Sequence, residues 1–182
     1  MRREIAAVKA TLKKMNGSLS GAELITTPLG PLYAAANGRG IFLLKFVDES
    51  AAGSLPVQKG SKLIGGLRHE LDRYFKGKLL KFATPVKFET GTDFQKKVWK
   101  SLGKIPFGKT FTYQQIAQTV GTPEGFRAVG MANGANPVAI LVPCHRVINA
   151  SGHLGGYSGG ISRKLKLLEI EGHKVSPKGQ LL

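Results

Sequence analysis

The amino-acid sequence predicts an α/β protein made of two domains, residues 1–90 and 91–182. Short apolar segments separated by turn-forming residues predict strands in the first domain. Apolar residues at helical spacing predict helices in both domains. The second domain also has two short helical segments joined by a glycine-containing turn, which is the arrangement of a helix-turn-helix. Residues 81–92 form the predicted connection between the domains.

The first domain is predicted to combine helices with three strands. One helix is predicted over residues 4–15, and another over residues 62–75, where large apolar residues recur every four positions. The strands are predicted at residues 24–27, 31–35 and 41–46. No segment of this domain carries a chemical motif, so we expect it to support the second domain.

The second domain begins with a predicted helix for which Thr92 and Asp93 are both suitable N-cap residues. Gly103 ends this helix. A last helix is predicted over residues 163–172, after a segment rich in glycine at 152–160.

Two short helices lie between these elements. Thr112 caps the first, over residues 113–120, and Gly121-Thr122-Pro123 ends it. The second is predicted from Pro123 to about Asn133, because proline is favoured at the first helical position. In a helix-turn-helix the second helix meets DNA. Two-helix corners also occur in ordinary cores, so the pair alone leaves both interpretations open.

Charge is the strongest signal in the composition. The chain has 27 Lys+Arg and 11 Asp+Glu, which gives a net charge of +16, and each predicted domain carries +8. Such an excess favours a polyanionic partner, and nucleic acid is the commonest one. A solvated basic surface without a specific partner is the alternative.

The sequence gives no indication of a membrane span or a metal site. No run of about 18 apolar residues is present. The single cysteine excludes an internal disulfide and is typical of a reducing compartment, so we expect a soluble, cytoplasmic protein. The four histidines show no metal-ligand spacing, and we expect neither a metal nor a cofactor.

The only cysteine stands in the motif Pro143-Cys144-His145-Arg146-Val147. A free thiol has a pKa of about 8.5 and is mostly protonated at neutral pH, so a catalytic cysteine needs a base or a positive environment. His145 can supply either. A lone cysteine is more often a small buried apolar residue, and the motif alone leaves that alternative open. The apolar residues 138–142 place the thiol on a strand or a tight turn.

Further motifs surround this one. They are Gly91-Thr92-Asp93-Phe94-Gln95, Val98-Trp99, residues 105–110, Tyr113, Arg127-Ala128-Val129-Gly130, Asn136-Pro137, residues 155–160 and residues 167–172. In order and spacing they resemble the O6-alkylguanine-DNA alkyltransferases, also called methylated-DNA–protein-cysteine methyltransferases. The resemblance covers nearly all of residues 91–173 and is loose before residue 91. It implies a ribonuclease-H-like α/β domain followed by a winged-helix-like (helix-turn-helix) domain that holds the site and the DNA surface.

The resemblance implies DNA repair by direct, irreversible transfer of an alkyl group from O6-alkylguanine to Cys144, so that each molecule reacts once. O4-alkylthymine is a further candidate substrate. The implied partner is double-stranded DNA, bound through its minor groove by a monomer that flips the damaged base, in the cytoplasm or in a eukaryotic nucleus. One alternative is an alkyltransferase-like protein that binds lesions without transfer, although those proteins lack the reactive cysteine. Another is a basic DNA-binding regulator with a structural cysteine.

Removing an alkyl carbon from guanine O6 requires a thiolate, a base, a group that orients the base and a hydrogen-bond donor near the purine. Cys144 supplies the thiolate, and His145 is the candidate base, acting through an ordered water. By the resemblance, Glu171 orients His145, Asn136 positions the thiol, and Tyr113 donates to the guanine. We expect this setting to lower the pKa of the Cys144 thiol.

The resemblance also implies which residues meet the DNA and the guanine. Arg127 is the finger that takes the place of the flipped base. The expected DNA-binding residues are Thr122, Phe126, Arg127, Ala128 and Gly130. The expected pocket residues are Val147, Gly155, Gly156, Tyr157 and Ser158. Relatives more often show a small residue where Phe126 stands, so Phe126 either wedges into the groove or packs against the protein.

Overall fold

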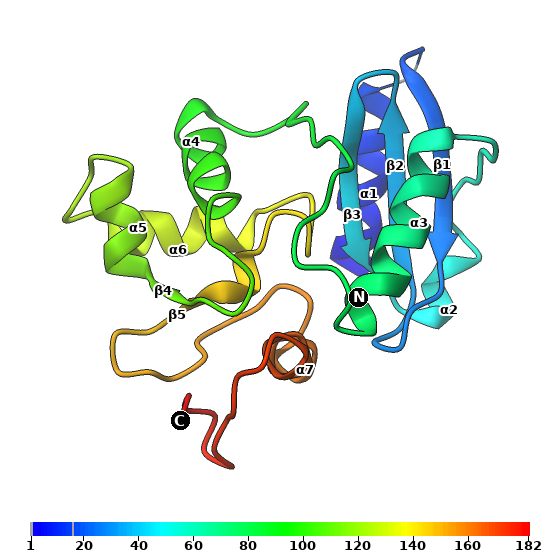
Figure 1. Cartoon of the computed structure of the whole chain (residues 1–182). Coiled ribbons are helices and arrows are strands. Elements are labelled where there is room, and N and C mark those ends of the chain that lie inside the picture. The colour runs from blue at the N-terminus through cyan, green and yellow to red at the C-terminus, as the bar shows by residue number, and fades with distance from the viewer. Residues whose placement is uncertain (1, 16) are drawn as a thin grey trace. The chain divides into compact units, whose positions relative to one another are not determined.

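The chain divides between Thr90 and Gly91 into two units, Met1–Thr90 and Gly91–Leu182 (Figure 1). The computed structural model describes residues 2–15 and 17–182. No helix among these residues is long and apolar enough to cross a membrane. A sheet forms the centre of the first unit, whereas helices dominate the second.

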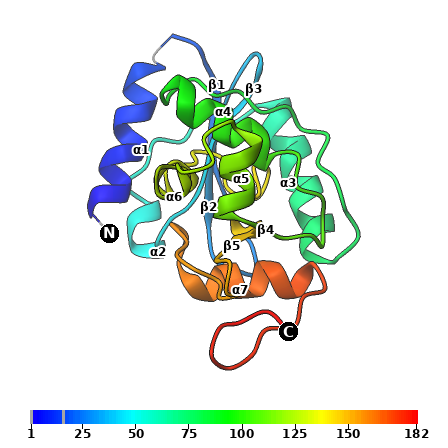
Figure 2. The same ribbon diagram turned by 90° about the vertical axis from the view of Figure 1, so that its left-hand side faces the viewer.

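A three-stranded antiparallel sheet in the order β1-β2-β3 forms the centre of the first unit. The strands are β1 (Leu19–Ile25), β2 (Leu32–Asn37) and β3 (Gly40–Phe46). Helices α1 (Arg2–Lys14) and α3 (Lys62–Phe75) cover opposite faces of this sheet in both views, and α2 (Glu49–Ala52) is a single short turn (Figures 1 and 2). Every residue of β2 is buried, as expected for a central strand with a helix on each face.

The predicted helix over residues 62–75 is confirmed by α3. The first strand differs from its prediction, because β1 begins well before residue 24 and ends before Thr27. Thr27 belongs to a turn, in which its hydroxyl donates to Gly30 O at 2.6 Å. Gly21 obscured the strand, since glycine weakens a strand pattern. It is needed there because a Cβ would lie 2.4 Å from the Cβ of Ser61.

The second unit combines four helices with a short pair of strands. The elements are α4 (Asp93–Leu102), β4 (Phe111–Thr112), α5 (Tyr113–Thr119), α6 (Phe126–Gly134), the 3-10 turn η1 (Cys144–Arg146), β5 (Val147–Ile148) and α7 (Ile161–Ile170). Strands β4 and β5 pair in parallel, with Phe111 opposite Val147. This pairing brings the start of α5 beside the segment that follows Cys144.

Local sequence explains how α4 and α5 begin. Thr92 caps α4 and Thr112 caps α5, which confirms both predicted caps. In each case a glutamine three residues later, Gln95 or Gln115, closes a capping box by bonding back to the backbone of the cap. Two of the free N–H groups at each helix start are thereby satisfied.

Helix α6 begins at Phe126 and not at the predicted Pro123. The intervening residues form a turn, in which Gly125 N–H donates to Thr122 O at 2.7 Å. The carbonyl of Pro123 accepts from the side chain of Gln114, which further fixes this turn. The preference of proline for a helix start is therefore overridden by contacts from α5.

Between α6 and η1 the chain makes turns and no strand. Val142 N–H donates to Val138 O at 3.0 Å, and Ile140 has a φ of 68°. Of the two alternatives for residues 138–142, the tight turn is correct. Cys144 then opens η1 in the buried interior of the unit.

Candidate active site

Cys144 is held in the core by the side chain of Asn136. The thiol residue is 2% exposed. Asn136 Nδ2 donates to Cys144 Sγ at 3.1 Å and to Val142 O at 2.8 Å, while its Oδ1 accepts from Val138 N–H at 3.0 Å. One amide side chain thus fixes the turns before the cysteine and the sulfur itself.

His145 follows the cysteine and is completely buried. Its Nε2 lies 2.9 Å from Glu171 Oε1. An ionised carboxylate only accepts hydrogen bonds, so Nε2 carries the proton and Nδ1 keeps a free lone pair. Within the described part of the chain, Nδ1 is buried and has no hydrogen-bond partner. The imidazole is therefore oriented as a base whose basic nitrogen points away from Glu171.

Glu171 is shared with a residue that the sequence analysis did not select, Arg146. Arg146 Nε donates to Glu171 Oε2 and Nη2 donates to Oε1, both at 2.8 Å, while Nη1 donates to Ile105 O. Burial raises the pKa of Glu171, but hydrogen bonds from His145 and Arg146 outweigh it and bring that pKa to about 2. The carboxylate therefore stays charged. An arginine directly after the candidate base in one motif was the signal that could have found this pair.

The expected lowering of the Cys144 pKa is wrong. Burial raises the pKa of this thiol above its ordinary value. The hydrogen bond from Asn136 and the charge of Lys164 act in the opposite direction but do not outweigh burial. Burial also lowers the pKa of His145, so the imidazole is neutral and able to accept a proton. The resting pair is thus a thiol beside a neutral base.

Tyr113 lies between α6 and the loop that follows Ile148. A Cβ added to Gly130 would lie 3.8 Å from the ring of Tyr113, and one added to Gly155 would lie 3.4 Å from its hydroxyl. Gly155 has a φ of 67°, a conformation that favours glycine. Burial raises the pKa of Tyr113, and Cys144 raises it further when the sulfur is a thiolate, so the hydroxyl keeps its proton.

The other predicted pocket residues lie at differing depths. Val147 is buried directly after η1, whereas Gly156 and Ser158 are exposed. The hydroxyl of Tyr157 is buried and lacks a hydrogen-bond partner among the described residues. Burial raises the pKa of Tyr157, and Cys144 raises it further when the sulfur is a thiolate. A buried phenol without a partner is a donor that is available to a bound molecule.

The residues expected to meet DNA lie around the start of α6. Thr122, Arg127 and Ala128 are exposed, and Phe126 is 42% exposed. The guanidinium carbon of Arg127 lies 5.8 Å from the centre of the Phe126 ring. Phe126 is therefore not part of the core, and its ring packs against the guanidinium of Arg127 at the surface.

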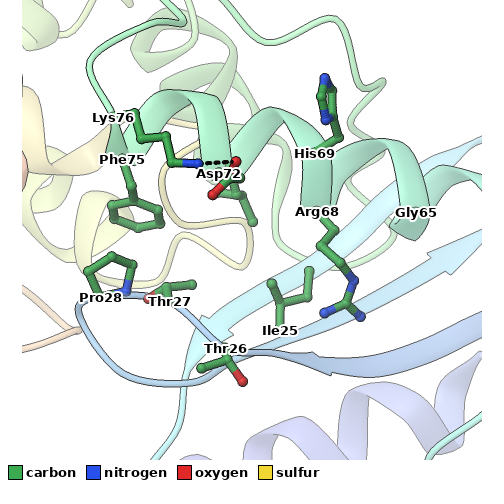
Figure 3. A pocket seen from close by; sticks show the side chains of 11 residues that line it. Ile25, Thr26, Thr27, Pro28, Gly65, Arg68, His69, Asp72, Phe75 and Lys76 are labelled. Atoms are coloured by element: carbon green, nitrogen blue, oxygen red, sulfur yellow. Dashed lines mark hydrogen bonds and ion pairs between the residues drawn. The ribbon is translucent and has the colours of Figure 1, made fainter.

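A cavity of about 510 Å³ lies in the first unit, between α3 and the turn after β1 (Figure 3). Its lining includes the apolar residues Ile25, Leu71 and Phe75, and its Arg, Lys and Asp side chains are already paired. Lys76 Nζ lies 2.8 Å from Asp72 Oδ2, and Arg68 is paired with Glu23. Its lining contains no cysteine and comes from the first unit. Nowhere in the described ranges do three potential metal-ligating side chains come together.

Two family models match the chain. The one described as "6-O-methylguanine DNA methyltransferase, DNA binding domain" matches residues 93–173. The one described as "6-O-methylguanine DNA methyltransferase, ribonuclease-like domain" matches residues 22–88. These matches confirm the expected fold, an α/β protein with a ribonuclease-like domain followed by a DNA-binding domain.

Individual relatives resemble the chain over most of its length. The methylated-DNA–protein-cysteine methyltransferase of Mycobacterium leprae (strain TN) is 48% identical over 153 residues, which cover 82% of this chain and 90% of that protein. The protein of the same name from Methanosarcina barkeri (strain Fusaro / DSM 804) is 42% identical and covers 82% and 95%. A crystal structure of Mycobacterium tuberculosis OGT in complex with DNA is 45% identical, has a TM-score of 0.75 and covers 82% and 91%.

Proposed function

This chain belongs to the 6-O-methylguanine DNA methyltransferase family, and on that premise we propose that Cys144, His145 and Glu171 form its reaction centre. The chain repairs DNA by transferring an alkyl group from O6-alkylguanine to a cysteine, and Cys144 is the only cysteine in its sequence. The product is a thioether, which is not reversed, so each molecule reacts once. The free lone pair of buried His145 beside that cysteine is the observation that carries the assignment.

The reaction begins with a proton transfer. The Cys144 thiol gives its proton to His145 Nδ1 through an intervening water, and Glu171 supports the imidazolium that forms. The thiolate sulfur then attacks the alkyl carbon in line. A new carbon–sulfur bond forms while the carbon–O6 bond breaks, and its electron pair leaves with the guanine.

The departing guanine needs a hydrogen bond or a proton. Tyr113 supplies the hydrogen bond, because its raised pKa keeps the hydroxyl protonated. The proton taken up by His145 returns through solvent to the guanine, so the net change is one alkyl group exchanged for one proton. The high pKa of the resting thiol keeps the sulfur protonated until a substrate is bound, which limits reactions with other electrophiles.

The guanine is held in a pocket beside the thiol. Val147 forms one wall, and the loop with Gly155, Gly156, Tyr157 and Ser158 forms the other. The buried hydroxyl of Tyr157 supports this proposal, because it has no hydrogen-bond partner among the described residues. No cofactor is required, since the alkyl group comes from the DNA and stays on the protein.

DNA is the partner, and we propose that α6 enters its minor groove. Arg127 takes the place of the flipped nucleotide, whose extrusion costs a few kcal/mol. Ala128 and Gly130 allow a close approach of the helix, while Thr122 contacts the backbone. Phe126 acts as an apolar wedge, since minor-groove proteins insert such side chains between base steps. The minor groove offers little sequence information, which suits a protein that must scan any sequence.

One alkyl-accepting site in one chain supports a monomer, and the single free cysteine supports a location in the reducing cytoplasm. A lesion-binding protein without transfer is not favoured, because the acceptor cysteine is present beside its base.

Intact-protein mass spectrometry after incubation with duplex DNA containing O6-methylguanine tests the function. We expect the gain of one methyl group, located on Cys144 by peptide mapping. Cys144→Ala should bind the DNA with nearly unchanged affinity and gain nothing. An unmodified wild-type protein, or methylation of the alanine variant, would overturn the assignment.

A further inference from the structure

Lys164 is a buried lysine in α7 that the reaction above does not use. The residue is 0% exposed, although lysine is almost never fully buried without a partner. No carboxylate pairs with it anywhere in the described chain. Its Nζ donates instead to three backbone carbonyls, those of Val147 at 2.6 Å, of Leu154 and of Gly156 at 3.4 Å.

The three carbonyls belong to two segments that are separate in sequence. Val147 opens β5 directly after η1, which holds Cys144 and His145. Leu154 and Gly156 stand on either side of Gly155, the residue that packs against the hydroxyl of Tyr113. The ammonium of Lys164 therefore connects the strand that follows the thiol in the chain to the loop that contains Gly155.

A site made of three carbonyl acceptors favours the charged ammonium form of lysine over the neutral amine. An ammonium has three N–H donors and no acceptor, so one nitrogen can satisfy all three oxygens at a single point. Burial lowers the pKa of Lys164 to about 8, whereas Cys144 raises it when the sulfur is a thiolate. The charged form with all three donors thus predominates at neutral pH.

The loop needs hydrogen bonds that restrict its conformation, because it is rich in glycine. Glycines stand at positions 152, 155, 156, 159 and 160, and glycine loses more conformational freedom on folding than any other residue. A loop of this composition samples many conformations unless contacts fix it. The same segment carries Tyr157 and Ser158.

We propose that Lys164 is a positioning residue, which fastens the loop of residues 154–160 to β5 and so fixes the wall of the guanine pocket. The proposal rests on the proposed function, because it assigns that loop to the guanine. In this role Lys164 acts through the loop and not on the sulfur or the alkyl carbon. Its effect is on how often the pocket has the shape that binds guanine.

This role is tested with two alkylating reagents, of which only one needs a correctly shaped guanine pocket. Free O6-methylguanine needs the pocket, whereas iodoacetamide needs only access to the buried thiol. In Lys164→Met, which keeps a long unbranched side chain but has no donors, the O6-methylguanine concentration for half-maximal rate should rise by about tenfold or more, as expected for lost hydrogen bonds. Compared at equal thiolate fraction, iodoacetamide should alkylate Cys144 as fast as in wild type or faster, because a loosened loop exposes the sulfur.

Lys166→Met is the matched control, since Lys166 lies on the same helix with an exposed side chain paired to Glu169. It should behave as wild type with both reagents. Lys164→Arg is the second variant, because it keeps the charge but cannot place three donors on one nitrogen. It should shift both reactions in the same directions as Lys164→Met. Circular dichroism and urea unfolding establish that each variant is folded.

Other outcomes would overturn the role. Equal slowing of both reagents in Lys164→Met, with recovery in Lys164→Arg, would show that Lys164 acts only through its charge on the thiol. An unchanged half-maximal concentration would also contradict it, and unfolding of both variants would assign Lys164 to the stability of the whole unit. If wild type and Lys166→Met fail to react with O6-methylguanine, the proposed function fails instead.

Discussion

The two units carry the same net charge of +8, but they bury different residues. In the described part of the first unit, the buried polar or charged residue is Asn37, and the ion pairs involve exposed side chains such as Arg39 and Lys76. The buried polar and charged residues of the second unit are Ser101, Asn133, Asn136, His145, Arg146, Lys164 and Glu171. Among the residues whose burial the structure describes, charged side chains therefore enter the interior of the second unit only.

Burying charge costs free energy unless each group is paired, and apolar residues of the same size are often at least as stabilising. The interior of the first unit follows this rule, because an apolar sheet packs between two helices. The interior of the second unit instead contains charged side chains in the region of Cys144. This difference supports the proposal that the buried charges of the second unit serve the reaction and its geometry.

The largest effect is expected from removing the charge of Glu171. In Glu171→Gln, Arg146 and His145 lose their buried partner, so the second unit should lose about 3–5 kcal/mol of unfolding free energy. Trp99 is the only tryptophan, lies in the second unit and is 2% exposed, so its fluorescence during urea unfolding reports on that unit.

Glu169→Gln is the matched control for Glu171. Its ion pair with Lys166 involves exposed side chains, and exposed pairs contribute about 0–1 kcal/mol. If the two variants lose equal stability, the contrast between buried and exposed charge in this protein is incorrect.

Arg127→Ala is expected to have the next largest effect, and only on duplex substrate. Extruding a base costs a few kcal/mol, and about 1.4 kcal/mol is a tenfold change, so repair of duplex DNA should slow by at least about tenfold. The rate with free O6-methylguanine should stay unchanged, since no base has to be extruded. Lys178→Ala, at an exposed position in the C-terminal tail, is the control. Equal slowing on both substrates would place Arg127 in the support of the pocket.

A smaller effect is expected from acid. The pKa of His145 is lowered from its ordinary 6.5, so the unfolded chain takes up this proton first and stability declines as pH falls below 6.5. The pKa of Glu171 is lowered from 4.5 to about 2, so its contribution is present above pH 4.5 and is lost as pH falls toward 2.

Each group contributes at most about 1.4 kcal/mol per pH unit. Trp99 fluorescence in urea, repeated between pH 7 and pH 3, should follow this decline. His145→Asn should remove the first step of the decline. A stability of the second unit that stays constant from pH 6.5 to pH 4.5 would show that His145 is not buried in its neutral form.

What the sequence predicted well was local. The caps Thr92 and Thr112 and the helix over residues 62–75 depend on neighbours in the chain, and all three are confirmed. The start of α6 was missed because the turn at residues 122–125 is fixed by a hydrogen bond from Gln114. Periodicity and residue preference contain no information about such a contact.

In the candidate site, too, local features were predicted and a contact between distant residues was missed. The motif selected Cys144 and His145, and the resemblance added Asn136 and Glu171. The structure brings Asn136 into contact with Cys144 and Glu171 into contact with His145. The bidentate pair between Arg146 and Glu171 spans 25 positions and was not predicted. The direction of the Cys144 pKa was predicted wrongly, because a motif specifies the neighbours of a thiol and not the depth at which it lies.

The tautomer of His145 tests the proposed reaction centre most directly. Nitrogen NMR of histidine-labelled protein at neutral pH, with the His145 signals assigned by their absence in His145→Asn, distinguishes protonated from unprotonated ring nitrogens. We expect a neutral imidazole with the proton on Nε2, bonded to Glu171, and an unprotonated Nδ1 that is ready to accept the proton of Cys144. A proton on Nδ1, or an imidazolium already present in the resting protein, would contradict this mechanism.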